Sequence, residues 1–114
     1  MIVCIPVTAD GQTGPHWGRA SRVALANVSD GRIIEWREVE VGWDAAHGTG
    51  TEGSHHARIA RFLREHEVEV VVANHMGEGM ARMLTTMGIP TMIGTRADAR
   101  EAVLGAVSAL DDSR

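Results

Sequence analysis

Hydrophobic and polar positions follow one another in blocks that predict secondary structure. Residues 70–73 are continuously apolar and mostly β-branched, a run that is too short for a lone helix and has no polar face. Such a run predicts a strand inside a sheet, covered on both sides. Residues 74–79 form a polar, glycine-bearing turn, and apolar positions then return at helical spacing at Met80, Met83, Leu84 and Met87. A strand, a turn and a helix therefore lie end to end.

The remaining apolar runs predict four further strands. Residues 2–7 form a buried run at the start, and the runs at 23–28 and 33–41 are joined by an Asp30-Gly31 hairpin signal. Residues 89–93 read as a short strand whose Pro90 suits the edge of a sheet.

Helical spacing of apolar residues marks three helices. The first is capped by Gly53-Ser54, and the second ends at Gly88. The third starts at Thr95 or Asp98 and leaves residues 111–114 as a polar tail. The glycine-rich loop at 42–54 is long for so compact a chain, which is typical of a mobile, functional segment.

This order, β-β-β-α-β-α-β-α, predicts an α/β fold with a single domain over residues 1–110. Right-handed crossovers make the strands at 2–7, 70–73 and 89–93 parallel and put the hairpin at one side of a five-stranded mixed sheet flanked by three helices. The carboxyl ends of the parallel strands then share one rim, where ligands bind in open α/β sheets. His75 follows residues 70–73, so we predict that it borders a site on that rim.

Charge and cysteine content argue against several classes of protein. A formal net charge of −4 disfavours general nucleic-acid binding, which needs a concentrated basic surface. No apolar run approaches the ~18 residues that cross a bilayer, and no basic leader is present, so we predict neither an export signal nor a membrane anchor. The single cysteine, Cys4, is expected as a buried thiol, which fits a cytoplasmic protein.

Histidine is unusually frequent, with six in a short chain, and imidazole is the commonest protein metal ligand. Histidines follow the first strand, follow the strand at 70–73 and occupy the loop between them, so several can reach the shared rim. The predicted metal ligands are His16, His47, His55 and His75. Their spacing is no zinc signature, because the adjacent His55 and His56 diverge on a helix. A zinc or other divalent-metal protein remains an alternative, whereas a cysteine-caged cluster is excluded as an internal site.

The turn at residues 77–79 offers a second kind of recognition. Backbone N–H groups at a helix start attract anions, and Arg19 is expected nearby. Anionic sulfide or carboxylate groups suit such a site, and an ordinary helix cap is the competing interpretation. A small-anion-binding regulatory module is therefore a further alternative.

Known catalytic patterns are missing from the sequence. Asp10 follows the first strand but has no convincing carboxylate companions, which disfavours two-metal nuclease chemistry. No Gly-x-Ser-x-Gly elbow or Walker phosphate loop is present. We therefore predict a protein that is not an enzyme.

Several segments together carry a family resemblance. They are the opening strand, His16-Trp17-Gly18-Arg19, the Asp30-Gly31 hairpin, the glycine and histidine loop, and Met76-Gly77-Glu78-Gly79-Met80-Ala81. This set resembles the dinitrogenase iron-molybdenum cofactor biosynthesis family, the small domain of NifX-like proteins that is also attached to larger cofactor-assembly proteins such as NifB.

The resemblance implies a ribonuclease H-like fold and a role in binding, carrying or delivering an iron-sulfur or iron-molybdenum cluster precursor. It implies metal-cluster assembly proteins as partners, and we expect a monomer or weak homodimer. His16 and Arg19 match the family's motif and are the first candidates for cluster contact. Asn74-His75 departs from it, since small residues are common there, and adds an imidazole. The predicted binding residues are His16, Arg19, His47, His75, Gly77 and Gly79.

Overall fold

The structure is a computed structural model that describes residues 1–46, 51–94 and 97–112. Its strands are β1 (Ile2–Pro6), β2 (Arg22–Ser29), β3 (Arg32–Glu40), β4 (Val70–Ala73) and β5 (Thr91–Ile93). Its helices are α1 (Trp43–Ala46), α2 (Glu52–Glu65), α3 (Glu78–Thr86) and α4 (Ala99–Asp112).

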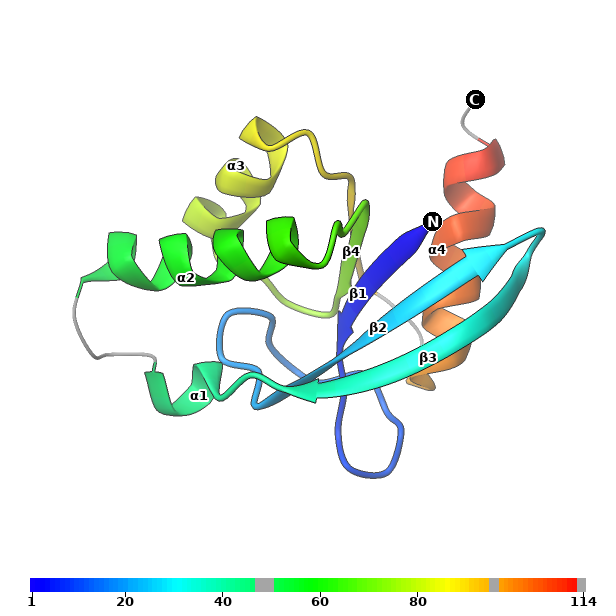
Figure 1. Cartoon of the computed structure of the whole chain (residues 1–114), viewed down its shortest axis with the longest axis horizontal. Coiled ribbons are helices and arrows are strands. Elements are labelled where there is room, and N and C mark those ends of the chain that lie inside the picture. The colour runs from blue at the N-terminus through cyan, green and yellow to red at the C-terminus, as the bar shows by residue number, and fades with distance from the viewer. Residues whose placement is uncertain (47–50, 95–96, 113–114) are drawn as a thin grey trace.

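The strands form one mixed sheet in the order β3-β2-β1-β4-β5 (Figure 1). β1, β4 and β5 run parallel, while β2 is antiparallel to both of its neighbours. The predicted five-stranded sheet, with its hairpin at one side and the last strand at the edge, is thus confirmed, although β5 begins at Thr91 and Pro90 lies just before it. The ribonuclease H-like designation stays a prediction.

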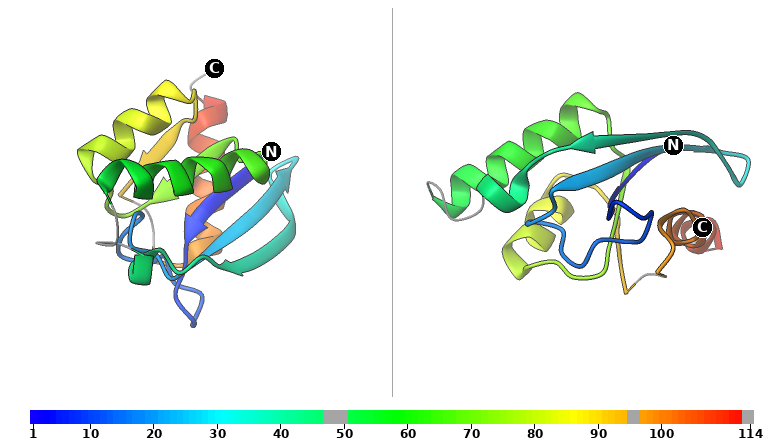
Figure 2. Two further views of the ribbon diagram at one scale, coloured as in Figure 1. Left: turned by 60° about the vertical axis from the view of Figure 1, so that its left-hand side comes forward. Right: turned by 90° about the horizontal axis from the view of Figure 1, so that it is seen from below.

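Helices cover both faces of the sheet (Figure 2). Alternation along β1 divides the core, since Val3 and Ile5 pack toward α4 while Cys4 packs toward α2 and α3. β4 divides in the same way, which explains its unbroken apolar sequence. The strand predicted to be covered on both sides is therefore buried along its whole length.

Local sequence signals account for several turns. Asp30 and Gly31 both adopt positive φ, the backbone of a tight two-residue hairpin turn. Gly88 ends α3 with a φ of +74°, and its N–H donates to the carbonyl of Thr85. Of the two predicted starts for the last helix, Asp98 is the cap, because its Oδ1 accepts from the N–H of Glu101 at 2.9 Å.

Three expectations about the helices need correction. The loop at 42–54 contains the short helix α1, anchored by the buried Trp43, so the described part of the chain has four helices rather than three. α2 is capped by Thr51, whose hydroxyl accepts from the N–H of Ser54, and not by Gly53-Ser54. α4 continues through Asp112 and so includes two residues of the expected tail.

Among the described residues, no helix is both long and apolar enough to span a bilayer.

Candidate functional site

Two chain segments meet beyond the carboxyl ends of the parallel strands β1 and β4. The backbone N–H of Trp17, in the loop after β1, donates to the carbonyl of His75, in the turn after β4, at 3.0 Å. Gly14 lets the loop fold back closely, because a Cβ there would lie 3.3 Å from the backbone carbon of Pro6. The imidazoles of His16 and His75 consequently meet edge to face, with their ring centroids 5.3 Å apart. The structure thus brings together the two histidines that were expected to share the rim.

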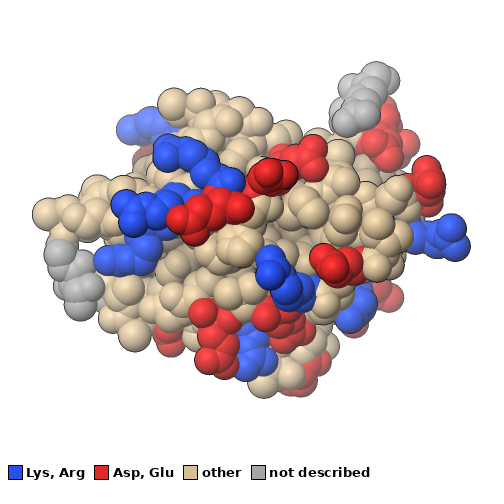
Figure 3. Space-filling view, viewed as in Figure 1, with Lys and Arg blue, Asp and Glu red and all other residues tan. Residues whose placement is uncertain are grey.

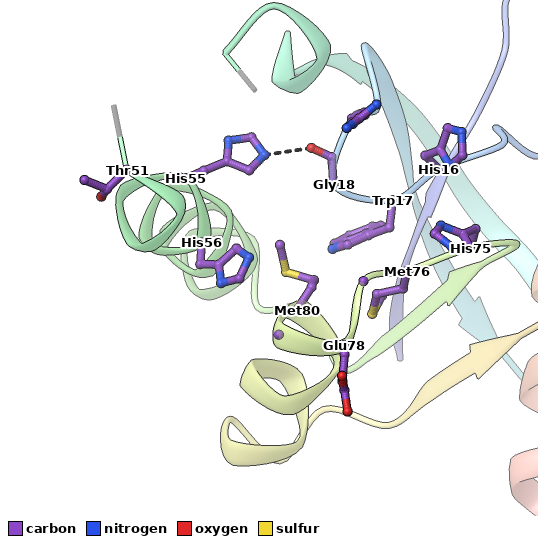
Figure 4. Close-up of a pocket in the computed structure, with 13 residues that line it drawn as sticks. His16, Trp17, Gly18, Thr51, His55, His56, His75, Met76, Glu78 and Met80 are labelled. Atoms are coloured by element: carbon purple, nitrogen blue, oxygen red, sulfur yellow. Dashed lines mark hydrogen bonds between the residues drawn. The ribbon is translucent and has the colours of Figure 1, made fainter. Parts of the chain in front are cut away.

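A pocket of about 590 Å³ opens between these segments and the start of α2; we call it the rim pocket (Figure 4). Its lining residues are His16, Trp17, Gly18, Arg19, Thr51, His55, His56, His75, Met76, Gly77, Glu78, Gly79 and Met80. Every predicted site residue that the structure describes is among them. His47 lies outside the described residues.

The N-terminus of α3 contributes backbone donors to the rim pocket. Gly77 is the N-cap in an extended conformation, and no side chain caps the helix there. The N–H groups of the first helical turn have no partner within a helix, and they sit at the positive end of its dipole. A Cβ on Gly77 would meet nothing within 4 Å, so this turn faces open space. The predicted anion-attracting turn therefore lies in the wall of the pocket.

Charged side chains around the rim pocket are few. Arg19 is exposed, and no ion pair or hydrogen bond of its side chain to another described residue is found. Glu78 carries the opposite charge, but its carboxylate points away from the pocket centre and lies 3.9 Å from the Arg82 guanidinium (Figure 4). Basic side chains also gather over α2, where Arg58 and Arg64 are exposed (Figure 3). The surface over α2 is therefore more basic than the net charge of the chain suggests.

His55 is held differently from the His16 and His75 pair. It is 5% exposed, and its Nε2 lies 2.7 Å from the carbonyl oxygen of Gly18. Its Nδ1 lies 3.1 Å from the Arg58 guanidinium. A carbonyl only accepts and a guanidinium only donates, so Nε2 carries the proton and Nδ1 accepts. Both ring nitrogens are engaged by the protein, and the lone pair on Nδ1 is not free for a metal ion.

Trp17 was noted in the sequence motif but was not predicted as a site residue. Its side chain is completely buried and packs edge to face on Trp43 at 5.2 Å. Its indole Nε1 is a buried donor without a hydrogen-bond partner in the described part of the chain. A buried donor left unpaired costs about 1–3 kcal/mol. Residue spacing in the sequence does not reveal that the indole nitrogen is buried without a partner. His56 and Met80 also line the pocket and were not among the predicted site residues.

Metal-binding chemistry based on a complete protein cage finds no support. Cys4 is fully buried in β1, as expected, and burial raises the pKa of its thiol far above the ordinary range, so a thiolate is not formed there. Among the described residues, no three His, Cys, Asp or Glu side chains come together as metal ligands. A bound metal group would have to bring most of its own ligands.

The structure is a small α/β domain whose rim pocket is walled by imidazoles, methionines and backbone donors. The chain belongs to the dinitrogenase iron-molybdenum cofactor family, whose profile matches residues 1–109. This membership confirms the resemblance seen in the sequence and associates the chain with the biosynthesis or handling of metal clusters. No curated protein sequence gives a significant match to the chain.

Solved structures share the fold at low sequence identity. The protein PH0822 is 18% identical with a TM-score of 0.73, over 96% of this chain and 91% of that one. The protein mj0327 from Methanocaldococcus jannaschii is 9% identical with a TM-score of 0.69, over 96% and 89%. The apo form of the orange protein from Desulfovibrio gigas is 19% identical with a TM-score of 0.66, over 98% and 88%. At these identities the likeness shows the fold alone.

Proposed function

We propose that this protein is a non-enzymatic carrier that binds an anionic iron-sulfur or iron-molybdenum cluster precursor in the rim pocket and passes it to cluster-assembly proteins. The observation that carries the proposal is the meeting of His16 and His75 beside the uncapped N-terminus of α3. Family membership supports the class of ligand.

The chemistry of the pocket suits a ligand that already holds its own sulfides. Such a cluster needs only one or two open coordination positions filled, and a neutral imidazole from His16 or His75 can fill them. Its negative charge is met by the backbone N–H groups after Gly77 and by Arg19. Met76 and Met80 add soft, polarizable lining.

The accessibility of these groups fits transfer better than permanent storage. His16, Arg19, His75 and Gly77 are all exposed in the structure. A ligand held by a few exposed groups dissociates more readily than one enclosed by a full set of thiolates. We therefore expect reversible binding that a partner with stronger ligands can outcompete.

Anaerobic titration with tetrathiomolybdate, a simple molybdenum-sulfide dianion, tests the proposal. We expect the charge-transfer bands of the anion to shift when it binds, with the shift saturating at one equivalent, and we expect His16→Ala and His75→Ala each to weaken binding about tenfold. His66→Ala is the matched control, since His66 lies at the end of α2 beside Arg37 and outside the rim pocket. Unaltered binding in both pocket variants would reject His16 and His75 as the groups that bind the ligand.

Elemental analysis of the freshly purified protein separates the alternatives. Stoichiometric zinc without acid-labile sulfide would favour the divalent-metal hypothesis over the carrier. Binding of phosphate in place of tetrathiomolybdate, measured by calorimetry after chelation, would favour a small-anion regulatory module.

A further inference from the structure

The indole N–H of Trp17 is a hydrogen-bond donor that is not paired with any described residue. Trp17 is one of the residues that line the rim pocket, and its indole N–H is completely buried. Figure 4 shows the nitrogen-bearing edge of the indole turned toward the side of the pocket where Met80 and α2 lie. Folding has fixed the direction of this donor without giving it an acceptor.

We propose that the Trp17 indole N–H is a directional hydrogen-bond donor to the anion held in the rim pocket, and that it selects ligands presenting an acceptor atom at that depth. This inference rests on the proposed function, because the acceptor is a sulfide of the bound metal-sulfur anion. The acceptor restores the hydrogen bond that the indole N–H lacks in the free protein.

The surroundings of the indole fix its orientation. The Trp17 ring packs edge to face against Trp43, and the Trp17 backbone N–H is bonded to the carbonyl of His75. Gly18 follows directly, and its carbonyl is bonded to the buried His55. Contacts of the ring and of the neighbouring backbone therefore hold the donor in one orientation before a ligand arrives, which lowers the entropy lost on binding.

Access to the donor requires one side chain to move. The indole nitrogen has no exposed surface, and the thioether of Met80 lies beside it in Figure 4. The Met80 methyl carbon also lies close to Gly18, since a Cβ on that glycine would be 3.9 Å from it. Methionine has three rotatable bonds and adapts its packing readily. Rotation of Met80 opens the path from the pocket to the N–H.

Replacement of the donor provides the test, with tetrathiomolybdate as the probe. Trp17→Phe removes the N–H and keeps an aromatic ring, and we expect binding about tenfold weaker. Trp36→Phe makes the same chemical change outside the pocket, where the Trp36 indole donates to Glu38, and binding should stay within about twofold. Benzothienylalanine at position 17, introduced by codon suppression, keeps the indole shape without the N–H and covers the case in which Trp17→Phe fails to fold.

A second readout observes the donor directly. In ¹H–¹⁵N spectra the indole signal of Trp17, assigned from its loss in Trp17→Phe, should move downfield on addition of tetrathiomolybdate, while that of Trp36 stays in place. A purely structural role for Trp17 would not produce this shift.

The outcomes separate this inference from the proposed function. Binding that His16→Ala and His75→Ala weaken but both Trp17 replacements leave intact overturns the donor role and keeps the carrier. Binding that the Trp17 replacements weaken while the histidine variants do not supports the donor and removes the imidazoles from the site. Absence of binding by the wild-type protein overturns both.

Discussion

The two faces of the sheet are covered by different kinds of side chain. The face toward α4 is closed by small aliphatic side chains, among them Val3, Ile5 and Val103, all fully buried. The opposite face packs against Trp17 and Met80 beside the rim pocket, and the buried Trp17 indole N–H there has no partner among the described residues. The sheet thus has an aliphatic core on one face and, on the other, a core that borders the rim pocket. Stability and binding should therefore respond to different residues.

Ile5→Ala is the strongest test of this separation. Ile5 is fully buried against α4, so truncation leaves a cavity and should lower the free energy of unfolding by about 3 kcal/mol, as measured by urea denaturation. Tetrathiomolybdate affinity of the folded protein, measured well below the unfolding midpoint, should match the wild type. A parallel loss of affinity would show that the two faces are coupled.

His55→Ala tests how much the buried hydrogen bond between His55 and Gly18 stabilises the face that carries the rim pocket. The variant leaves the Gly18 carbonyl without its 2.7 Å donor, and we expect the free energy of unfolding to fall by about 2 kcal/mol. His55→Gln retains an N–H donor and should recover part of that loss. If His55→Ala abolished metal binding and left stability unchanged, the histidine would be a ligand rather than a positioning residue.

The comparison of faces also explains what could be predicted from sequence. Apolar runs and turn residues such as Asp30-Gly31 and Gly88 act locally, so the strand order and several turns followed from them. His16 and His75 were expected near each other because each directly follows a parallel strand.

Other features depend on contacts between segments far apart in the chain. His55 received the same expectation as the other histidines, yet its ring bonds to Gly18 and Arg58 in the interior. The burial of Trp43, which anchors α1, likewise arises only when the loop after β1 packs against the helices. The same packing buries the Trp17 indole N–H without a partner in the described part of the chain. The type of a residue indicates which bonds its side chain can form. Whether its polar atoms are still free to contact a ligand depends on its neighbours in the folded structure.

Arg19→Gln sharpens the comparison through charge alone. Arg19 is exposed and lines the rim pocket, so we expect tetrathiomolybdate to bind about fivefold more weakly and with a smaller dependence on salt. The urea midpoint should not change, because no ion pair to another described residue is lost. Arg32→Gln, in the exposed hairpin, is the charge-matched control. Equal effects of the two substitutions would indicate a response to net charge rather than to a local site.

Glu78→Gln should have the smallest effect and the most informative sign. Glu78 stabilises the N-terminus of α3 as a first-turn acid, so its neutralisation should lower the free energy of unfolding by about 0.5 kcal/mol. The same change removes a negative charge beside the pocket, so affinity for the dianion should rise about twofold at low salt, and the gain should vanish at high salt. A variant that is less stable yet binds more tightly cannot be explained by general damage to the fold. If affinity fell instead, the bound species would not be recognised as an anion at this helix start.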